Sequence, residues 1–195
     1  TFGPGFNPDN VTREIVGSAS FIRTGCDSGA MNWLIDKDNN CRRQGRMNLQ
    51  RLSSVMGMDC GRPAFPPEIE AGLLSGSWYD PSHSGEGYVL EVLSDHRVLV
   101  YWFSYDPQGN RRWFFGVGEI VGGNLVFDEM HTTHGGIFGA GFDPDQVQLE
   151  SWGSLELELE CESGIARFTP TEAGFSQGTL NLTRLTFLRG LSCPP

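Results

Sequence analysis

The chain has 195 residues and a formal net charge of −10, with thirteen arginines and a single lysine, Lys37. Nucleic acids and anionic lipids both attract basic surfaces, so this charge argues against either as a partner. No apolar run approaches the roughly 20 residues of a membrane-spanning helix, and no membrane insertion is expected.

The first third of the chain repeats its last third. Residues 2–18 align with residues 138–154, and ten of the 17 positions are identical. After short gaps, Cys26-Asp-Ser-Gly aligns with Cys161-Glu-Ser-Gly, and the repeat continues to the ends of both segments. Self-similarity of this kind decides the architecture before any local motif does. The sequence therefore predicts three parts: a partial unit at residues 1–60, a Pro-rich linker at 61–72 and a complete unit at 73–195.

Short strands separated by turn signals are predicted along the whole chain. In the partial unit they are residues 16–23, 30–36 and 45–53, followed by a short turn of helix at 66–73. In the complete unit they are residues 76–80, 86–93, 97–105, 111–120, 124–130, 153–160, 164–170 and 178–188. The segment 97–105 is apolar on both faces, as in a strand that is covered on each side.

Eight antiparallel strands at this spacing predict an all-β fold, either a closed up-and-down barrel or a sandwich. Closure is attractive because it leaves no exposed strand edge. Three strands alone make a poor domain. The partial unit is therefore expected to pack on the complete unit or to pair with another chain.

Four of the five cysteines occupy matched repeat positions, which predicts the disulfides Cys26–Cys60 and Cys161–Cys193. Each would contribute roughly 2–4 kcal/mol, and such bonds persist in oxidising compartments. A secreted, periplasmic or cell-surface location is therefore expected, with any targeting segment removed or outside these residues. Cys41 has no counterpart, and is either a free thiol or the partner of a cysteine in the missing half of the first unit.

An arginine in the last predicted strand, Arg184, falls among inward-facing aliphatic residues. A buried guanidinium needs a partner, and a tryptophan face supplies one through stacking. Gly76-Ser-Trp78 opens the first strand of the unit, and Arg51 holds the position of Arg184 in the partial unit. In these residues the chain resembles the calycin superfamily (lipocalins and their relatives), which implies an eight-stranded calycin-like barrel. The other lipocalin loop motifs are not evident, so the resemblance implies the barrel and not a lipocalin ligand pocket.

A second resemblance covers residues 73–193 and, through the repeat, residues 2–60. It rests on the segments Trp78-Tyr-Asp-Pro-Ser-His-Ser-Gly-Glu-Gly-Tyr88, Tyr101-Trp-Phe-Ser-Tyr-Asp-Pro-Gln-Gly-Asn110 and Phe142-Asp-Pro-Asp-Gln-Val147. These look like a repeat module of exported proteobacterial proteins that occurs singly, in tandem or beside other domains. The resemblance implies an exported bacterial protein and no particular activity.

Aromatic residues concentrate between positions 78 and 115. Aromatic faces stack on sugar rings, hold apolar ligands or anchor protein interfaces. The ligand-binding candidates are Trp78, Tyr88, Tyr101, Trp102, Tyr105 and Trp113. The alternative is that these rings fill the barrel and its joint with the partial unit.

Two groups of histidines are weaker candidates. His131 and His134 could hold a transition metal, but their spacing fixes no third ligand, so no metal is expected. His83, Ser84 and Glu86 could form a hydrolase-type group, although adjacency along a chain rarely gives the geometry of a catalytic triad. We therefore expect no enzymatic activity.

Aromatic–Asp/Asn–Pro elements recur four times and are expected to be turns anchored by the aromatic ring. Their aspartates would bind calcium if the loops converged; otherwise no cofactor is expected. The aspartates concerned are Asp80, Asp106, Asp143 and Asp145.

These observations predict a non-enzymatic, secreted or cell-surface module that acts through binding or adhesion, with a glycan or another extracellular protein as the partner. A second hypothesis is a homo-polymeric or filament subunit whose partial unit is completed by strands from a neighbouring chain.

Overall fold

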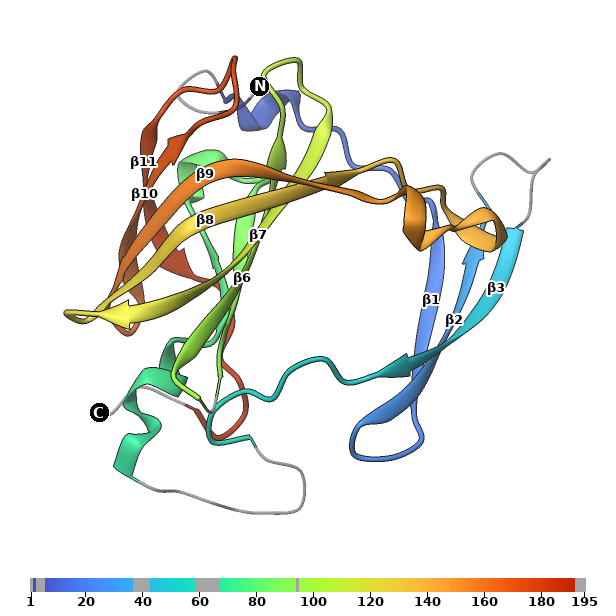
Figure 1. Cartoon of the computed structure of the whole chain (residues 1–195), viewed down its shortest axis with the longest axis horizontal. Coiled ribbons are helices and arrows are strands. Elements are labelled where there is room, and N and C mark those ends of the chain that lie inside the picture. Colours follow the sequence, from blue (N-terminus) through green and yellow to red (C-terminus); the bar gives the residue numbers. More distant parts are fainter. Residues whose placement is uncertain (1, 3–5, 37–42, 59–66, 94, 192–195) are drawn as a thin grey trace.

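The computed structural model describes residues 2, 6–36, 43–58, 67–93 and 95–191. Its fold is all-β, which confirms the predicted class: eight antiparallel strands close into a barrel, and three more form a separate sheet. Figure 1 shows the barrel and the sheet on opposite sides of the molecule. In the described part of the chain, no helix is both long and apolar enough to cross a membrane.

The separate sheet belongs to the partial unit. It contains β1 (Gly17–Arg23), β2 (Ser28–Ile35) and β3 (Arg43–Gln50), paired in that order and antiparallel. A 3-10 turn, η2 (Pro8–Asn10), precedes it, and η3 (Pro67–Leu74) lies where a short turn of helix was predicted. Trp33 sits on the central strand opposite Ala19 on one side and Gly45 on the other.

The barrel is formed by the complete unit. The strands are β4 (Gly76–Tyr79), β5 (Gly87–Val92), β6 (Arg97–Tyr105), β7 (Arg111–Val121), β8 (Asn124–His134), β9 (Gln148–Leu159), β10 (Ser163–Pro170) and β11 (Gly178–Arg184). They close in the order β10-β11-β4-β5-β6-β7-β8-β9. Three 3-10 turns interrupt them: η4 (Pro81–His83), η5 (Gly139–Gly141) and η6 (Pro144–Gln146).

Three strand boundaries differ from the sequence prediction by four residues or more. β8 runs four residues further, to His134, and β9 begins five residues earlier, at Gln148, so that the two form a long hairpin. Register shifts at Met130 bend this hairpin, as bulges do, and its loop reaches the three-stranded sheet (Figure 1). β11 ends at Arg184 rather than at residue 188.

The barrel is filled by side chains that alternate with outward-facing residues along each strand. The largest fully buried ones are Trp78, Trp102, Trp152, Tyr88, Phe114 and Phe127. Packed rings of this size contribute most of the apolar area that the barrel removes from water. The part of the barrel interior that these rings occupy is therefore filled by side chains.

The partial unit contributes to this core at both of its ends. Phe2 is buried among aromatic rings of the barrel, with centroid distances of 5.4 Å to Trp102 and 5.3 Å to Phe168. After β3 the chain returns to the end of β5, where Met56 is buried and donates its amide to Val92 O. The partial unit thus packs on the complete one through its flanking segments and also through Trp33 of β2, whose ring centroid lies 5.0 Å from that of Phe138.

Arg184 lies over Trp78, with the guanidinium carbon 5.3 Å from the ring centroid. Its nitrogens donate to the carbonyls of Ser75, Cys161 and Thr186 at 2.8, 3.1 and 3.1 Å. Burial lowers the pKa of this guanidinium. The Trp78 indole N–H donates to Leu74 O, so both members of the pair have their polar groups satisfied.

Cys26 and Cys161 are both disulfide-bonded. Cys41, Cys60 and Cys193 lie outside the described residues. The pairing of Cys26 with Cys60 and of Cys161 with Cys193 therefore stays a prediction.

Candidate binding surface

The six aromatic candidates divide between the inside and the outside of the barrel. Trp78, Tyr88 and Trp102 point inward and are buried, so a ligand at the surface cannot reach them. Burial raises the pKa of the Tyr88 hydroxyl well above its usual value. The Tyr88 hydroxyl and the Trp102 indole N–H are buried without a hydrogen-bond partner in the described residues. These three rings are part of the core, as the alternative in the sequence analysis held.

The outer face of β6 and β7 carries four rings side by side, which we call the outer aromatic patch: Tyr101, Phe103, Trp113 and Phe115. Strand register places Tyr101 opposite Phe115 and Phe103 opposite Trp113. Trp113 and Phe115 are nearly parallel, with centroids 5.2 Å apart. Phe103 is 51% exposed and Trp113 is 37% exposed. A contiguous exposed apolar surface of this kind marks an interaction site more often than scattered apolar residues do.

The sequence prediction that residues 97–105 are covered on both faces holds for Leu99, which is buried, and fails at Phe103. The reason is that strand β6 lies in a single-layered barrel wall. Its inner face fills the core, but within the described residues no layer covers the whole of its outer face.

A polar rim borders the patch at the start of β7, where the exposed Arg111 shares the outer face with Trp113. The next residue, Arg112, points to the inner side of the wall: its guanidinium carbon lies 5.8 Å from the Phe114 ring centroid and 5.4 Å from that of Phe175, and it makes two hydrogen bonds of 2.8 Å to the Glu172 carboxylate. A groove of about 270 Å³ lies beside the patch, lined among others by Phe103, Tyr105 and Trp113. The Tyr105 hydroxyl donates to Gly85 O at 3.4 Å. Aromatic faces and fixed hydrogen-bonding groups therefore lie together at this end of the patch.

His131 and His134 contact different groups. The His131 ring packs 5.7 Å from Phe115 at the border of the patch. His134 Nε2 lies 3.0 Å from Gln148 Oε1, and its Nδ1 lies 3.5 Å from Glu150. No described group of three or more His, Cys, Asp or Glu side chains could hold a metal ion.

The three residues of the hydrolase hypothesis lie close together, without the hydrogen bonds of a triad. His83 Nδ1 is 3.5 Å from Glu86 Oε1, and Glu86 Oε2 accepts from the Ser104 hydroxyl at 2.5 Å. Among the described contacts, the Ser84 hydroxyl makes no hydrogen bond to His83 or Glu86. Burial raises the pKa of Glu86, although the bond from Ser104 and the nearby His83 oppose that shift. Phe6 covers the His83 ring at 5.2 Å.

Three of the four aspartates of the calcium hypothesis, Asp80, Asp106 and Asp143, act as turn caps. Asp80 accepts from the Ser82 amide and hydroxyl and from the Asn181 amide. Burial raises the pKa of Asp80, but these hydrogen bonds outweigh it and the net shift is downward. Asp106 caps its own turn through Gln108 and Asn110. Asp143 accepts from the amide of Asp145 at 3.0 Å.

Phe103 and Phe115 belong to the aromatic-rich segment 78–115 that the sequence indicated, but they are not among the six residues chosen from it as ligand-binding candidates. The sequence did contain a signal for them. The predicted strands 97–105 and 111–120 are consecutive, and both carry aromatic residues on the face opposite Trp102. No protein family, curated protein or solved structure shows a significant match to this chain.

Proposed function

We propose that this chain is a non-enzymatic, exported binding module and that its outer aromatic patch binds carbohydrate. The observation that carries the proposal is the row of rings on β6 and β7, with Phe103 and Trp113 open to solvent. A sugar ring offers an apolar face of C–H groups that stacks on such rings. The patch is held by two fully paired strands, so little conformational freedom is lost on binding.

The rim supports a carbohydrate over an apolar ligand. A sugar needs hydrogen-bonding groups beside the stacking surface, and the groove at this end of the patch is lined by the exposed Arg111, a donor, and by Tyr105, whose hydroxyl donates to Gly85 O at 3.4 Å and can still accept a hydrogen bond. An apolar ligand would have no use for these polar groups.

The test is affinity electrophoresis through gels that contain soluble polysaccharides of different types. Any polysaccharide that retards the protein is then titrated into it to measure the affinity. The patch variant Phe103→Ala/Trp113→Ala should lose retardation. The control Phe21→Ala, which removes an exposed aromatic ring from β1, should keep it. Equal retardation of the patch variant and the wild type, or no retardation by any polysaccharide, would reject the proposal.

A further inference from the structure

The two repeat units exchange equivalent aromatic contacts. Phe2 of the partial unit packs on Phe168 in β10 of the barrel, with centroids 5.3 Å apart. Phe138 of the complete unit packs on Trp33 in β2 of the sheet, with centroids 5.0 Å apart. In the repeat alignment Phe2 corresponds to Phe138, and Phe168 corresponds to Trp33. The same loop-to-strand contact is therefore made twice, once in each direction.

The two copies of this contact differ in how well they are covered. Phe2 and Phe6 are 8% and 9% exposed, whereas their counterparts Phe138 and Phe142 are 63% and 58% exposed. Phe2 is enclosed because β6 and β7 add Trp102 and Phe114 above it. The partial unit has no strands equivalent to β6 and β7 among the described residues, so its copy of the contact is open on that side.

Arg51, directly after the edge strand β3, also lacks part of the contacts that its counterpart makes in the barrel. Like Arg184, it donates to the carbonyl of the matched cysteine, here Cys26 O at 3.3 Å. Arg184 also lies over Trp78 and donates to Ser75 O, both supplied by β4 and the residue before it. Arg51 is exposed and has no aromatic ring over it in the described residues. The group that is missing is an indole on a strand next to β3.

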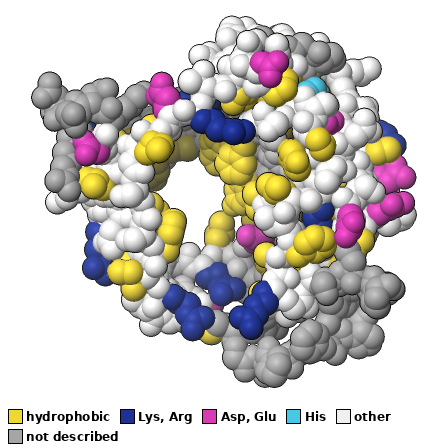
Figure 2. All heavy atoms as spheres, turned by 180° about the vertical axis from the view of Figure 1, so that it is seen from behind, with side chains coloured by type: hydrophobic (Ala, Val, Ile, Leu, Met, Phe, Trp, Pro, Cys, Tyr) yellow, Lys and Arg dark blue, Asp and Glu magenta, His cyan; other side chains and the backbone are white. Residues whose placement is uncertain are grey.

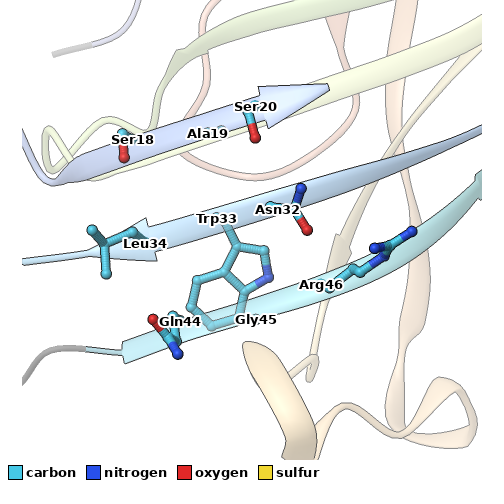
Figure 3. A pocket seen from close by; sticks show the side chains of 9 residues that line it. All are labelled: Ser18, Ala19, Ser20, Asn32, Trp33, Leu34, Gln44, Gly45 and Arg46. Atoms are coloured by element: carbon cyan, nitrogen blue, oxygen red, sulfur yellow. The ribbon is translucent and has the colours of Figure 1, made fainter. Parts of the chain in front are cut away.

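The backbone of the sheet is open at both edges. In the described residues β1 and β3 pair with β2 alone, whereas their barrel equivalents β9 and β11 also pair with β8 and β4. A depression of about 650 Å³ lies over the middle of the sheet, lined among others by Ser20, Asn32 and Arg46 (Figure 3). A larger groove of about 990 Å³ lies between Trp33 and Phe138. Figure 2 shows an open passage between the sheet and the barrel, with hydrophobic and basic side chains around it.

We propose that the β1–β3 sheet is a docking site for a five-stranded antiparallel ribbon of the same module, with the chemistry of β4–β8. Its first strand pairs with β3 and places the indole of a Gly-x-Trp on the Arg51 guanidinium. Its last strand pairs with β1, and its middle strands cover Phe138 and Phe142. The occupant is a ribbon that is not already closed, because in a second copy of this chain β4–β8 are held in the barrel by β9 and β11.

The probe for this site is a labelled fragment with the sequence of residues 75–134, which contains β4–β8 and Trp78. It is diluted from urea into the full-length chain, and binding is followed by fluorescence anisotropy. Saturable binding is expected, together with slower hydrogen exchange of the β3 amides. Loss of the Arg–Trp contact should weaken binding roughly tenfold, both for Arg51→Ala in the chain and for Trp78→Ala in the fragment.

The matched control is Arg167→Ala, which removes an exposed arginine from β10 of the barrel, away from the β1–β3 sheet, and should leave binding unchanged. Three results would overturn the proposal. One is the absence of saturable binding. The second is binding that does not respond to Arg51→Ala, because the fragment would then be invading the resident barrel. The third is self-association of the chain through β1–β3, which would make a second copy the occupant. None of these readouts involves carbohydrate, so they are independent of the proposed function.

Discussion

Arg184 in the barrel and Arg51 in the three-stranded sheet occupy matched repeat positions. The same substitution can therefore be compared in a closed barrel and in an open sheet. Arg184→Ala would remove three hydrogen bonds from a charged donor, leaving the carbonyls of Ser75, Cys161 and Thr186 without it. Each bond of this type contributes about 1.5–3 kcal/mol, and stacking on Trp78 adds about 1 kcal/mol. These contributions are not additive. We therefore expect Arg184→Ala to lower the free energy of unfolding by about 4 kcal/mol, within the range for breaking a buried charged network.

Arg51→Ala is the control for this prediction. Arg51 makes one hydrogen bond of 3.3 Å and an exposed ion pair of 3.3 Å with Asp27. Exposed pairs contribute about 0–1 kcal/mol, so Arg51→Ala should lower the free energy of unfolding by less than about 1 kcal/mol. Arg184→Lys should fall between the two, because a single ammonium cannot reach three separated carbonyls as a guanidinium does.

The assay is urea unfolding followed by near-ultraviolet circular dichroism, which reports on the tryptophans packed in the barrel. Stability is obtained by linear extrapolation to water. A loss below about 1 kcal/mol for Arg184→Ala, or equal losses for Arg184→Ala and Arg51→Ala, would refute the reasoning. It would mean that the buried guanidinium does not hold the closure between β11 and β4.

Three further predictions concern other parts of the chain. Phe2→Ala should lower the free energy of unfolding of the barrel by about 3 kcal/mol, as for other buried phenylalanines; urea unfolding would show no change if Phe2 lay outside the core. Trp113→Ala should abolish carbohydrate binding yet change the free energy of unfolding by less than about 1 kcal/mol, because the ring is partly exposed; a large loss of stability would assign Trp113 to the fold. Glu86 has a raised pKa in the folded chain, so its contribution to stability is complete below its ordinary pKa and is lost as pH rises through the raised value. The stability of Glu86→Gln relative to the wild type should therefore increase with pH across that window in urea titrations, and a constant difference would contradict the burial of the charge.

The repeat and the alternating strands were enough to predict the all-β class, the eight barrel strands and the three strands of the sheet. Two of the three strand ends that were misplaced lack that alternation. The tips of β8 and β9, around His131 and Glu150, are polar on both faces because they extend beyond the barrel core. In β11 the alternation continues to Leu188, but the regular pairing ends at Arg184, because the amides of Leu185 and Thr186 both donate to the same acceptor, Ser77 O.

The division of the aromatic residues could not be predicted from β6 and β7 alone. When both faces of a strand are apolar, the period of two does not say which face is inside. Trp102 and Phe103 are neighbours of similar size, and the closure of the barrel buries the first and exposes the second. The burial of Phe2 in the barrel could not be predicted either. The repeat shows that Phe2 matches Phe138, but it does not show in which unit the Phe2 ring packs.

Comparison of the two units shows which packing contacts form within three strands alone and which need the closed barrel. In both, the aromatic ring of the central strand lies against a glycine of the next strand: Trp33 over Gly45 in the sheet and Phe168 over Gly178 in the barrel. Any Cβ at these glycines would overlap the ring, so the packing depends on the glycine and not on the rest of the barrel. The β1–β3 sheet therefore has barrel-like local geometry before any ribbon is added. A docking surface that is already in its bound conformation loses less entropy on association, which favours completion of this sheet over its rearrangement.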